Sequence, residues 1–167
     1  KNTTDKMERV SLINHFLDQF KGTIYRQTMF AEFEMKINAM AERGESITAD
    51  ALCNLYEELQ KQYFGDEIII DDEIRYEWSR IPHFYYNFYV FQYATGFSAA
   101  IALSQKILAE GKPAVDQYLN FLSGGCSKDP VSLLKDAGVD MNTAQPVNDA
   151  LDLFGQLIDE MEELLAD

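Results

Sequence analysis

Histidine, cysteine and basic side chains are all scarce in this sequence. The 167 residues include two histidines and two cysteines, and 14 Lys or Arg stand against 28 Asp or Glu, which gives a formal charge of −14. Nucleic-acid backbones and anionic membranes bind clustered basic side chains, so this charge balance argues against both as partners. Cys53 and Cys126 form no Cys-X-X-Cys motif or Cys/His cluster, which argues against a structural zinc site and a disulfide framework.

Long apolar runs and catalytic signature motifs are also missing. No uninterrupted run of about 18 apolar residues occurs, and the first residues, "KNTTDKMERV", lack the apolar centre of a signal peptide. We therefore expect a cytoplasmic protein without a membrane partner. The sequence has no HExxH motif, nucleophile elbow, phosphate-binding loop or dinucleotide fingerprint. It begins without methionine at a helix-start signal, so we expect it to be a piece of a longer polypeptide.

Hydrophobic periodicity predicts an all-α fold, a multi-helix bundle forming a single helical domain over residues 1–167. Apolar side chains recur at spacings of three and four along most of the chain. Asp5, Thr48 and Asp129 are candidate N-caps, while Gly22 is expected to end or bend the first helix and Gly65 to end the third. Prolines open further helices at Pro82, Pro113, Pro130 and Pro146.

Two segments of this pattern are less regular. The run Ile68–Ile70 is flanked by acidic residues, and we interpret it as a loop that inserts a buried plug of isoleucines, followed by a short helical turn near Tyr76 and Trp78. From Pro82 the pattern predicts one long helix that ends at Glu110, before Gly111.

The segment "IPHFYYNFYVFQYATGFSAA" contains a marked concentration of aromatic side chains. Seven of the chain's 20 Phe and Tyr residues lie between His83 and Tyr93. On a helix, successive residues are about 100° apart. With His83 at 0°, three phenylalanines then fall between roughly 80° and 140° and three tyrosines between roughly 240° and 300°. The first set is Phe84, Phe88 and Phe91, and the second is Tyr86, Tyr89 and Tyr93.

This separation suggests one face that packs and one that binds. A tyrosine pKa is about 10, so the phenols would stay protonated at neutral pH and could donate hydrogen bonds to a peptide backbone or a developing oxyanion. The alternative is a core helix whose hydroxyl groups reach loops or water. The other histidine, His15, is isolated in the sequence, and we interpret it as a structural or exposed residue.

Two stretches carry a family resemblance, "RIPHFYYNFYVFQYATGFSAAIAL" and "YLNFLSGGCSKDPVSLLKDAGVDM". With them, the whole chain resembles the C-terminal part of the catalytic domain in the oligoendopeptidase F group of the M3 family of zinc metallopeptidases. The resemblance implies a larger, two-lobed helical fold that encloses a channel for short peptides.

The resemblance also implies which part of the chemistry this chain supplies. The zinc ligands and general base are expected upstream of Lys1, in an HExxH segment that this chain lacks. The chain alone would then bind no metal or other cofactor and be inactive, whereas the full-length protein would be a zinc metalloendopeptidase. In that family a histidine and tyrosines stabilise the oxyanion and bind substrate. The resemblance matches His83 to this histidine and makes Tyr86, Tyr89 and Tyr93 the candidates for the tyrosines.

Two other functions remain as alternatives. The chain could be a non-catalytic helical domain that binds peptides or a partner, or a scaffold that forms homo-oligomers through a surface normally covered by the rest of the polypeptide. The expected partners are therefore short peptide substrates, the remainder of the same polypeptide, and a second copy of the chain.

Overall fold

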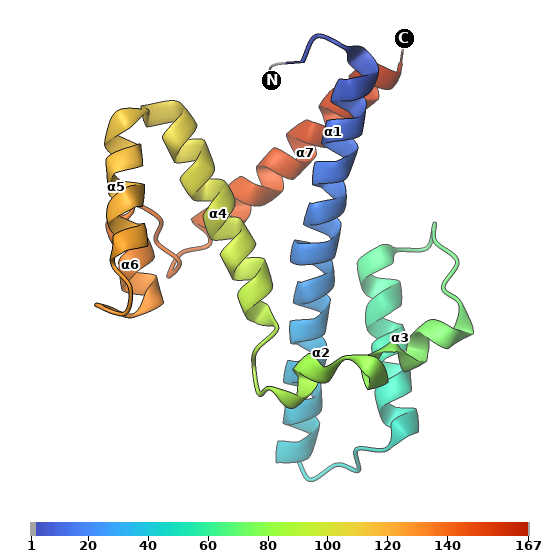
Figure 1. The fold of residues 1–167 in the computed structure, drawn as a ribbon. Coiled ribbons are helices and arrows are strands. Elements are labelled where there is room, and N and C mark those ends of the chain that lie inside the picture. The colour runs from blue at the N-terminus through green and yellow to red at the C-terminus, as the bar shows by residue number, and fades with distance from the viewer. Residues whose placement is uncertain (1–2, 167) are drawn as a thin grey trace. The chain divides into compact units, whose positions relative to one another are not determined.

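The computed structural model describes residues 3–166, and these residues form helices and connecting loops without a strand (Figure 1). The all-α prediction is therefore confirmed. The α-helices of this part of the chain are α1 (Lys6–Phe20), α2 (Arg26–Glu42), α3 (Ala49–Phe64), α4 (Phe91–Glu110), α5 (Lys112–Ser123), α6 (Pro130–Asp136) and α7 (Gln145–Leu165). A π-helical segment, η1 (Lys21–Tyr25), joins α1 to α2, and two 3-10 segments, η2 (Asp72–Arg80) and η3 (Pro82–Tyr85), precede α4.

The contacts divide the chain into two compact units. One contains the residues up to Phe20 together with those from Thr95 onward, and the other is Lys21–Ala94. This division describes where contacts concentrate. The prediction of a single domain over residues 1–167 stays a prediction.

The first unit is built on the packing of α1 against α7 (Figure 1). An ion pair between Arg9 and Glu160 ties the two helices together. Phe20 is fully buried, and its ring lies 5.3 Å from that of Phe154 and 5.2 Å from that of Phe97. Aromatic pairs at these separations add to the free energy gained by burying apolar surface.

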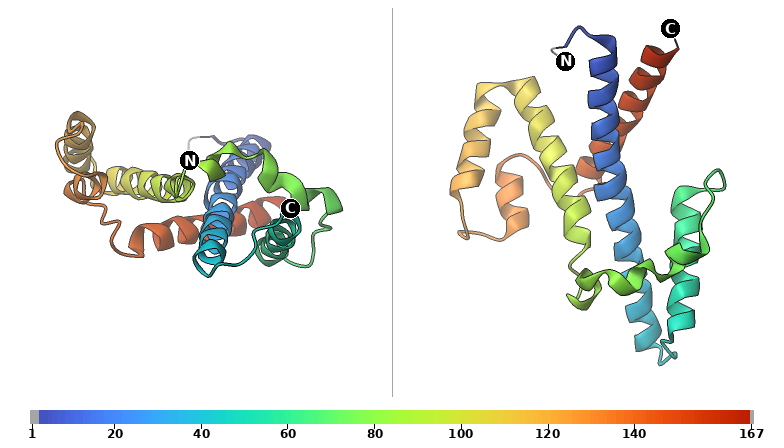
Figure 2. Two further views of the ribbon diagram at one scale, coloured as in Figure 1. Left: turned by 90° about the horizontal axis from the view of Figure 1, so that it is seen from below. Right: turned by 45° about the vertical axis from the view of Figure 1, so that its right-hand side comes forward.

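The second unit has a hydrophobic core of its own. Helices α2 and α3 lie side by side (Figure 2), and η2 packs against α3. Their facing side chains bury Phe33, Tyr56 and Leu59 almost completely. Ile81 and Val90, which flank η3 and the following turn, complete the same cluster. The segment between η2 and α4 is thus anchored to the core at both ends.

Most predicted helix boundaries are confirmed by the hydrogen bonds at the helix ends. Asp5 Oδ1 accepts the Glu8 N–H at 2.8 Å, Thr48 Oγ1 accepts the Ala51 N–H at 3.2 Å, and Asp129 Oδ1 accepts the Ser132 N–H at 2.9 Å. These caps satisfy amide groups that a helix leaves without intrahelical partners. Gly65 follows α3 with a φ of 73°, a conformation that favours glycine.

Gly22 was expected to end or bend the first helix. The α-helix α1 ends at Phe20, and Gly22 lies in the π-helical segment η1, through which the chain continues into α2. The prediction that the isoleucines of this loop are buried is wrong, since Ile69 is 91% exposed and Ile68 is also exposed. The charged acidic residues on both sides favour a position of the loop in solvent. The prediction of one long helix from Pro82 is also wrong, because α4 begins only at Phe91.

No helix in the described part of the chain combines the length and the apolar character needed to cross a membrane.

Candidate functional site

The aromatic segment leaves the core, turns, and then enters α4. Ile81 is extended, as expected for a residue before proline, and Pro82 opens the short 3-10 segment η3. A turn follows, in which Phe88 has a φ of 53°. A bulky side chain rarely adopts this left-handed conformation, and a right-handed helix cannot pass through it.

A buried carboxylate holds this turn in place. Glu34 on α2 is almost fully buried, and its Oε1 accepts the Phe88 N–H at 2.6 Å. In a continuous helix this N–H would bond a carbonyl four residues earlier. Burial raises the pKa of the Glu34 carboxyl, and the hydrogen bond from Phe88 only partly opposes this effect. The bond between Glu34 and the Phe88 N–H therefore accounts for the interruption of the predicted helix at this position.

The turn nevertheless brings the four predicted site residues together. The ring of His83 lies 5.6 Å from Tyr89, 5.9 Å from Tyr93 and 6.2 Å from Tyr86, measured between centroids. Tyr89 stacks on the imidazole, whereas the other two rings meet it edge-on. We call these four residues the His83 cluster.

The predicted phenylalanine face does not form. Phe84 packs against Phe30 and Phe33 in the core, with ring centroids 5.4 Å and 5.2 Å away. Phe88 and Phe91 are 48% and 47% exposed. The segment therefore has one inward-facing phenylalanine, because a turn does not keep the helical periodicity on which the prediction relied.

The His83 cluster presents hydrogen-bonding groups at the surface of this unit. The Tyr93 hydroxyl lies 3.3 Å from His83 Nε2, and the histidine tautomer decides which of the two donates. Hydrogen bonding with Tyr89 and partial loss of water raise the pKa of the Tyr93 phenol above its usual value of 10. Tyr93 therefore keeps its proton at neutral pH and can act as a neutral donor.

A cavity of about 310 Å³ opens beside the cluster, within the same unit. His83 and Tyr93 form part of its wall, and two arginines, Arg26 and Arg80, form another part. Its remaining lining residues are Gln27, Phe30, Ile81 and Pro82.

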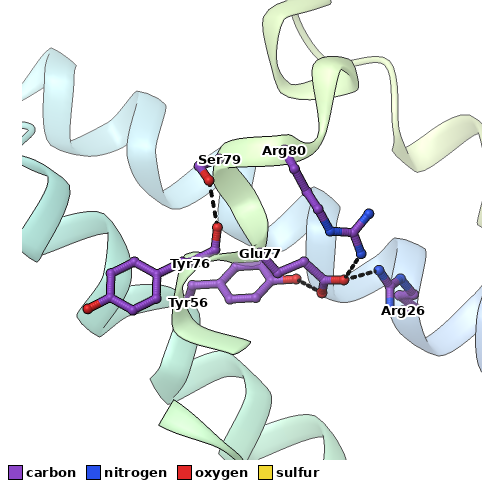
Figure 3. A network of polar contacts seen from close by, with 6 residues as sticks. All are labelled: Arg26, Tyr56, Tyr76, Glu77, Ser79 and Arg80. Carbon is purple, nitrogen blue, oxygen red and sulfur yellow. Dashed lines mark hydrogen bonds and ion pairs between the residues drawn. The ribbon is translucent and has the colours of Figure 1, made fainter. Parts of the chain in front are cut away.

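The two arginines belong to a polar network centred on the buried Glu77 side chain (Figure 3). The Glu77 carboxylate accepts hydrogen bonds from the Tyr56 hydroxyl at 2.6 Å, from Arg26 at 2.6 Å and from Arg80. Burial alone would raise the pKa of Glu77, but the bonds from Tyr56 and the two arginines outweigh it and lower the pKa. Burial, together with the bond to Glu77, raises the pKa of Tyr56.

Sequence reasoning missed Glu77, Arg26, Arg80 and Glu34. The spacing of Glu77 and Arg80, three residues apart, was a local signal for one ion pair. Arg26 lies 51 residues from Glu77, and Glu34 lies 54 residues from Phe88. No local pattern reveals contacts across such distances.

The remaining sequence candidates contribute no further site. His15 is exposed on α1, where its Nε2 lies 3.2 Å from the Gln19 amide. Among residues 3–166, no group of three or more His, Cys, Asp or Glu side chains could hold a metal ion. The described residues therefore do not fit a zinc centre of their own.

Comparisons with known proteins agree on one family. The family model described as Peptidase family M3 matches residues 1–153. Over 98% of its length the chain is 56% identical to oligopeptidase PepF of Bacillus subtilis, and over 99% it is 44% identical to the plasmid-encoded oligoendopeptidase F of Lactococcus lactis subsp. cremoris.

A solved structure gives the same result. The crystal structure of oligoendopeptidase-F from Enterococcus faecium matches 99% of this chain with a TM-score of 0.95 and 48% identity. The chain spans only part of these proteins: 24% of the Bacillus protein, 28% of the Lactococcus protein and 32% of the Enterococcus chain.

Proposed function

Because this chain belongs to peptidase family M3, as its sequence predicts, we propose that it is the C-terminal part of the catalytic domain of a zinc oligoendopeptidase. In this proposal the full-length protein hydrolyses internal bonds of short peptides, and the His83 cluster binds the carbonyl group that is attacked. The main observation in support is that the rings of His83 and the three tyrosines lie close together, although these residues do not lie on one helix. Helical periodicity therefore cannot account for their grouping.

The chemistry assigned to this chain is hydrogen-bond donation. A zinc ion, held by residues outside this chain, would act as a Lewis acid and lower the pKa of a bound water. The tyrosines of the His83 cluster would donate to the carbonyl oxygen as negative charge develops on it. A preorganised neutral donor stabilises that charge more in the transition state than in the ground state, which accelerates the reaction.

The wider assignments belong to the same proposal. We infer short peptides as substrates and the remainder of the same polypeptide as the intramolecular partner, and we propose a homo-oligomer as a second assembly. A cytoplasmic location is supported by two cysteines that form no disulfide, buried Cys53 and exposed Cys126, since reducing compartments keep thiols free.

The test uses single variants of the full-length enzyme. Tyr86→Phe, Tyr89→Phe, Tyr93→Phe and His83→Ala are assayed on a short peptide, with kcat and KM measured separately. Removing one oxyanion donor typically lowers kcat by about 10² to 10³. We expect at least one of the four changes to lower kcat by about tenfold or more.

Tyr85→Phe is the matched control. Tyr85 is adjacent in sequence but 81% exposed and outside the cluster, so its change should leave kcat unaltered. If no cluster variant lowers kcat by about tenfold, the carbonyl-binding role is wrong. Peptide binding without any hydrolysis by the full-length protein would instead favour a non-catalytic binding domain.

A further inference from the structure

The cavity beside the His83 cluster is positively charged, although the chain as a whole carries a formal charge of −14. Arg26 and Arg80 line it, and its lining includes no carboxylate. Behind the lining, these two guanidinium groups share the single Glu77 carboxylate. One positive charge therefore remains in excess at the cavity wall.

The two arginines differ in how firmly they are held. The Arg26 guanidinium lies 4.9 Å from the centre of the Phe30 ring, and about two-thirds of the Arg26 side chain is buried. Packing and the bond to Glu77 therefore fix its position. Arg80 is 69% exposed and donates from one nitrogen to Glu77. A guanidinium has five N–H donors in a planar fork, so Arg80 keeps several of them for a ligand.

We propose that this cavity binds a carboxylate group of the peptide substrate, with Arg80 as the principal donor. Arg–carboxylate pairs are stronger than neutral hydrogen bonds and often form two parallel bonds. Glu77 fixes the Arg80 side chain from behind without neutralising both guanidinium groups. The assignment of a peptide as ligand rests on the proposed function, whereas carboxylate binding rests on the charges of the cavity itself.

Because the cavity and the His83 cluster share a wall, the bound carboxylate must lie close to the peptide bond that is cleaved. His83 and Tyr93 belong to both. A peptide whose reacting carbonyl contacts the cluster would therefore place a nearby carboxylate in the cavity. That group is either the C-terminal carboxylate or an Asp or Glu side chain close to the cleaved bond.

The experiment compares matched peptides on the full-length protein. One short peptide is prepared as the free C-terminal acid and as the amide, and a second pair carries Asp or Asn beside the cleaved bond. Dissociation constants are measured by calorimetry after removal of the metal with a chelator, and kcat/KM is measured on the active enzyme. We expect at least one carboxylate member to bind roughly tenfold or more tightly than its neutral partner.

Arg80→Gln removes the positive charge but keeps a polar side chain with N–H donors. We expect it to abolish most of this preference while binding of the neutral peptides changes little. Arg43→Gln is the control for net charge, because Arg43 is also exposed and paired with a glutamate, Glu45, but does not line the cavity. Whichever pair shows the preference identifies the C-terminal or the side-chain carboxylate as the ligand.

Three results would overturn the proposal. The wild-type protein could bind acid and neutral peptides equally, a result that needs no variant to fold. Arg80→Gln could weaken all peptides by the same factor, or Arg43→Gln could remove the preference as effectively as Arg80→Gln. By contrast, a preference that persists in a protein without peptidase activity would refute the proposed function and leave the carboxylate site intact.

Discussion

At the scale of single residues, Glu77 joins three side chains of this region through one carboxylate. Its carboxylate is 6% exposed and accepts from one phenol and two guanidinium groups. A buried charge is tolerated only when it is paired and hydrogen-bonded, and here all three partners come from different positions in the sequence. Glu77 thereby connects α2, α3 and η2 (Figure 3).

We predict that Glu77→Ala lowers the free energy of unfolding by about 3 kcal/mol, because the buried Tyr56 hydroxyl and the partly buried Arg26 side chain lose their shared partner. Tyr56→Phe should cost only about 1 kcal/mol, since Glu77 keeps both arginines. Urea denaturation of the full-length protein measures both values. Glu73→Ala is the control, because Glu73 lies on the same 3-10 segment and is exposed; an equal loss for Glu73→Ala would contradict the prediction.

At the scale of elements, the turn between η3 and α4 arranges the His83 cluster. Its left-handed residue, Phe88, is half-exposed. The hydrogen bond to Glu34 therefore compensates for an unfavourable backbone conformation. Val90 and Ile81 fix the two ends of the segment in the core.

We predict that Glu34→Ala loosens this turn and lowers kcat by about tenfold while the helix content is retained, because misplaced donors stabilise the transition state less. Circular dichroism and steady-state kinetics of the full-length enzyme test this together. Glu34→Gln keeps an acceptor for the Phe88 N–H and should recover most of kcat. If Glu34→Ala keeps the wild-type kcat, the carboxylate is not a positioning residue.

At the scale of the whole molecule, two buried carboxyls should give opposite pH dependences. Glu77 has a lowered pKa when folded, so its contribution to stability is present above its unfolded pKa of about 4.5 and is lost as the pH falls through the folded value. Glu34 has a raised pKa when folded, so its contribution is present below about 4.5 and is lost as the pH rises through the folded value.

We therefore predict that, relative to wild type, Glu77→Gln becomes less stable as the pH rises toward about 4.5 from below, because the wild-type protein gains the contribution of Glu77 there. Relative to wild type, Glu34→Gln becomes more stable as the pH rises above about 4.5, because the wild-type protein loses the contribution of Glu34 there. Urea denaturation of the full-length variants at several pH values provides the measurement. Slopes of the same sign for the two variants would show that one of these pKa directions is wrong.

The sequence predicted the features that depend on neighbouring residues. Asp5, Thr48 and Asp129 cap helices because a side-chain oxygen reaches an amide three residues on, and such reach is visible in the sequence. The same kind of reasoning failed at Phe88, where a carboxylate from α2 takes the backbone N–H. It also failed at Ile69, where apolar character suggested burial that the acidic loop does not provide.

The grouping of His83 with the three tyrosines was expected from the family resemblance and from helical periodicity. The periodicity was the wrong reason, because a turn and not a helix face brings the rings together. The cavity and its arginines could not be predicted at all, since Arg26 and Arg80 meet only through Glu77.

By itself the sequence determined the helical class, most helix boundaries and the family, because these depend on local spacing and on stretches of matching residues. Only the tertiary structure decided where the long helix breaks, how the His83 cluster forms and which charges face the cavity. Those features depend on contacts such as those of Arg26 with Glu77 and of Phe88 with Glu34, in which the two residues lie more than fifty positions apart. A buried carboxyl needs hydrogen-bond partners, and Glu34 finds one in the Phe88 N–H, which a continuous helix would bond to its own backbone.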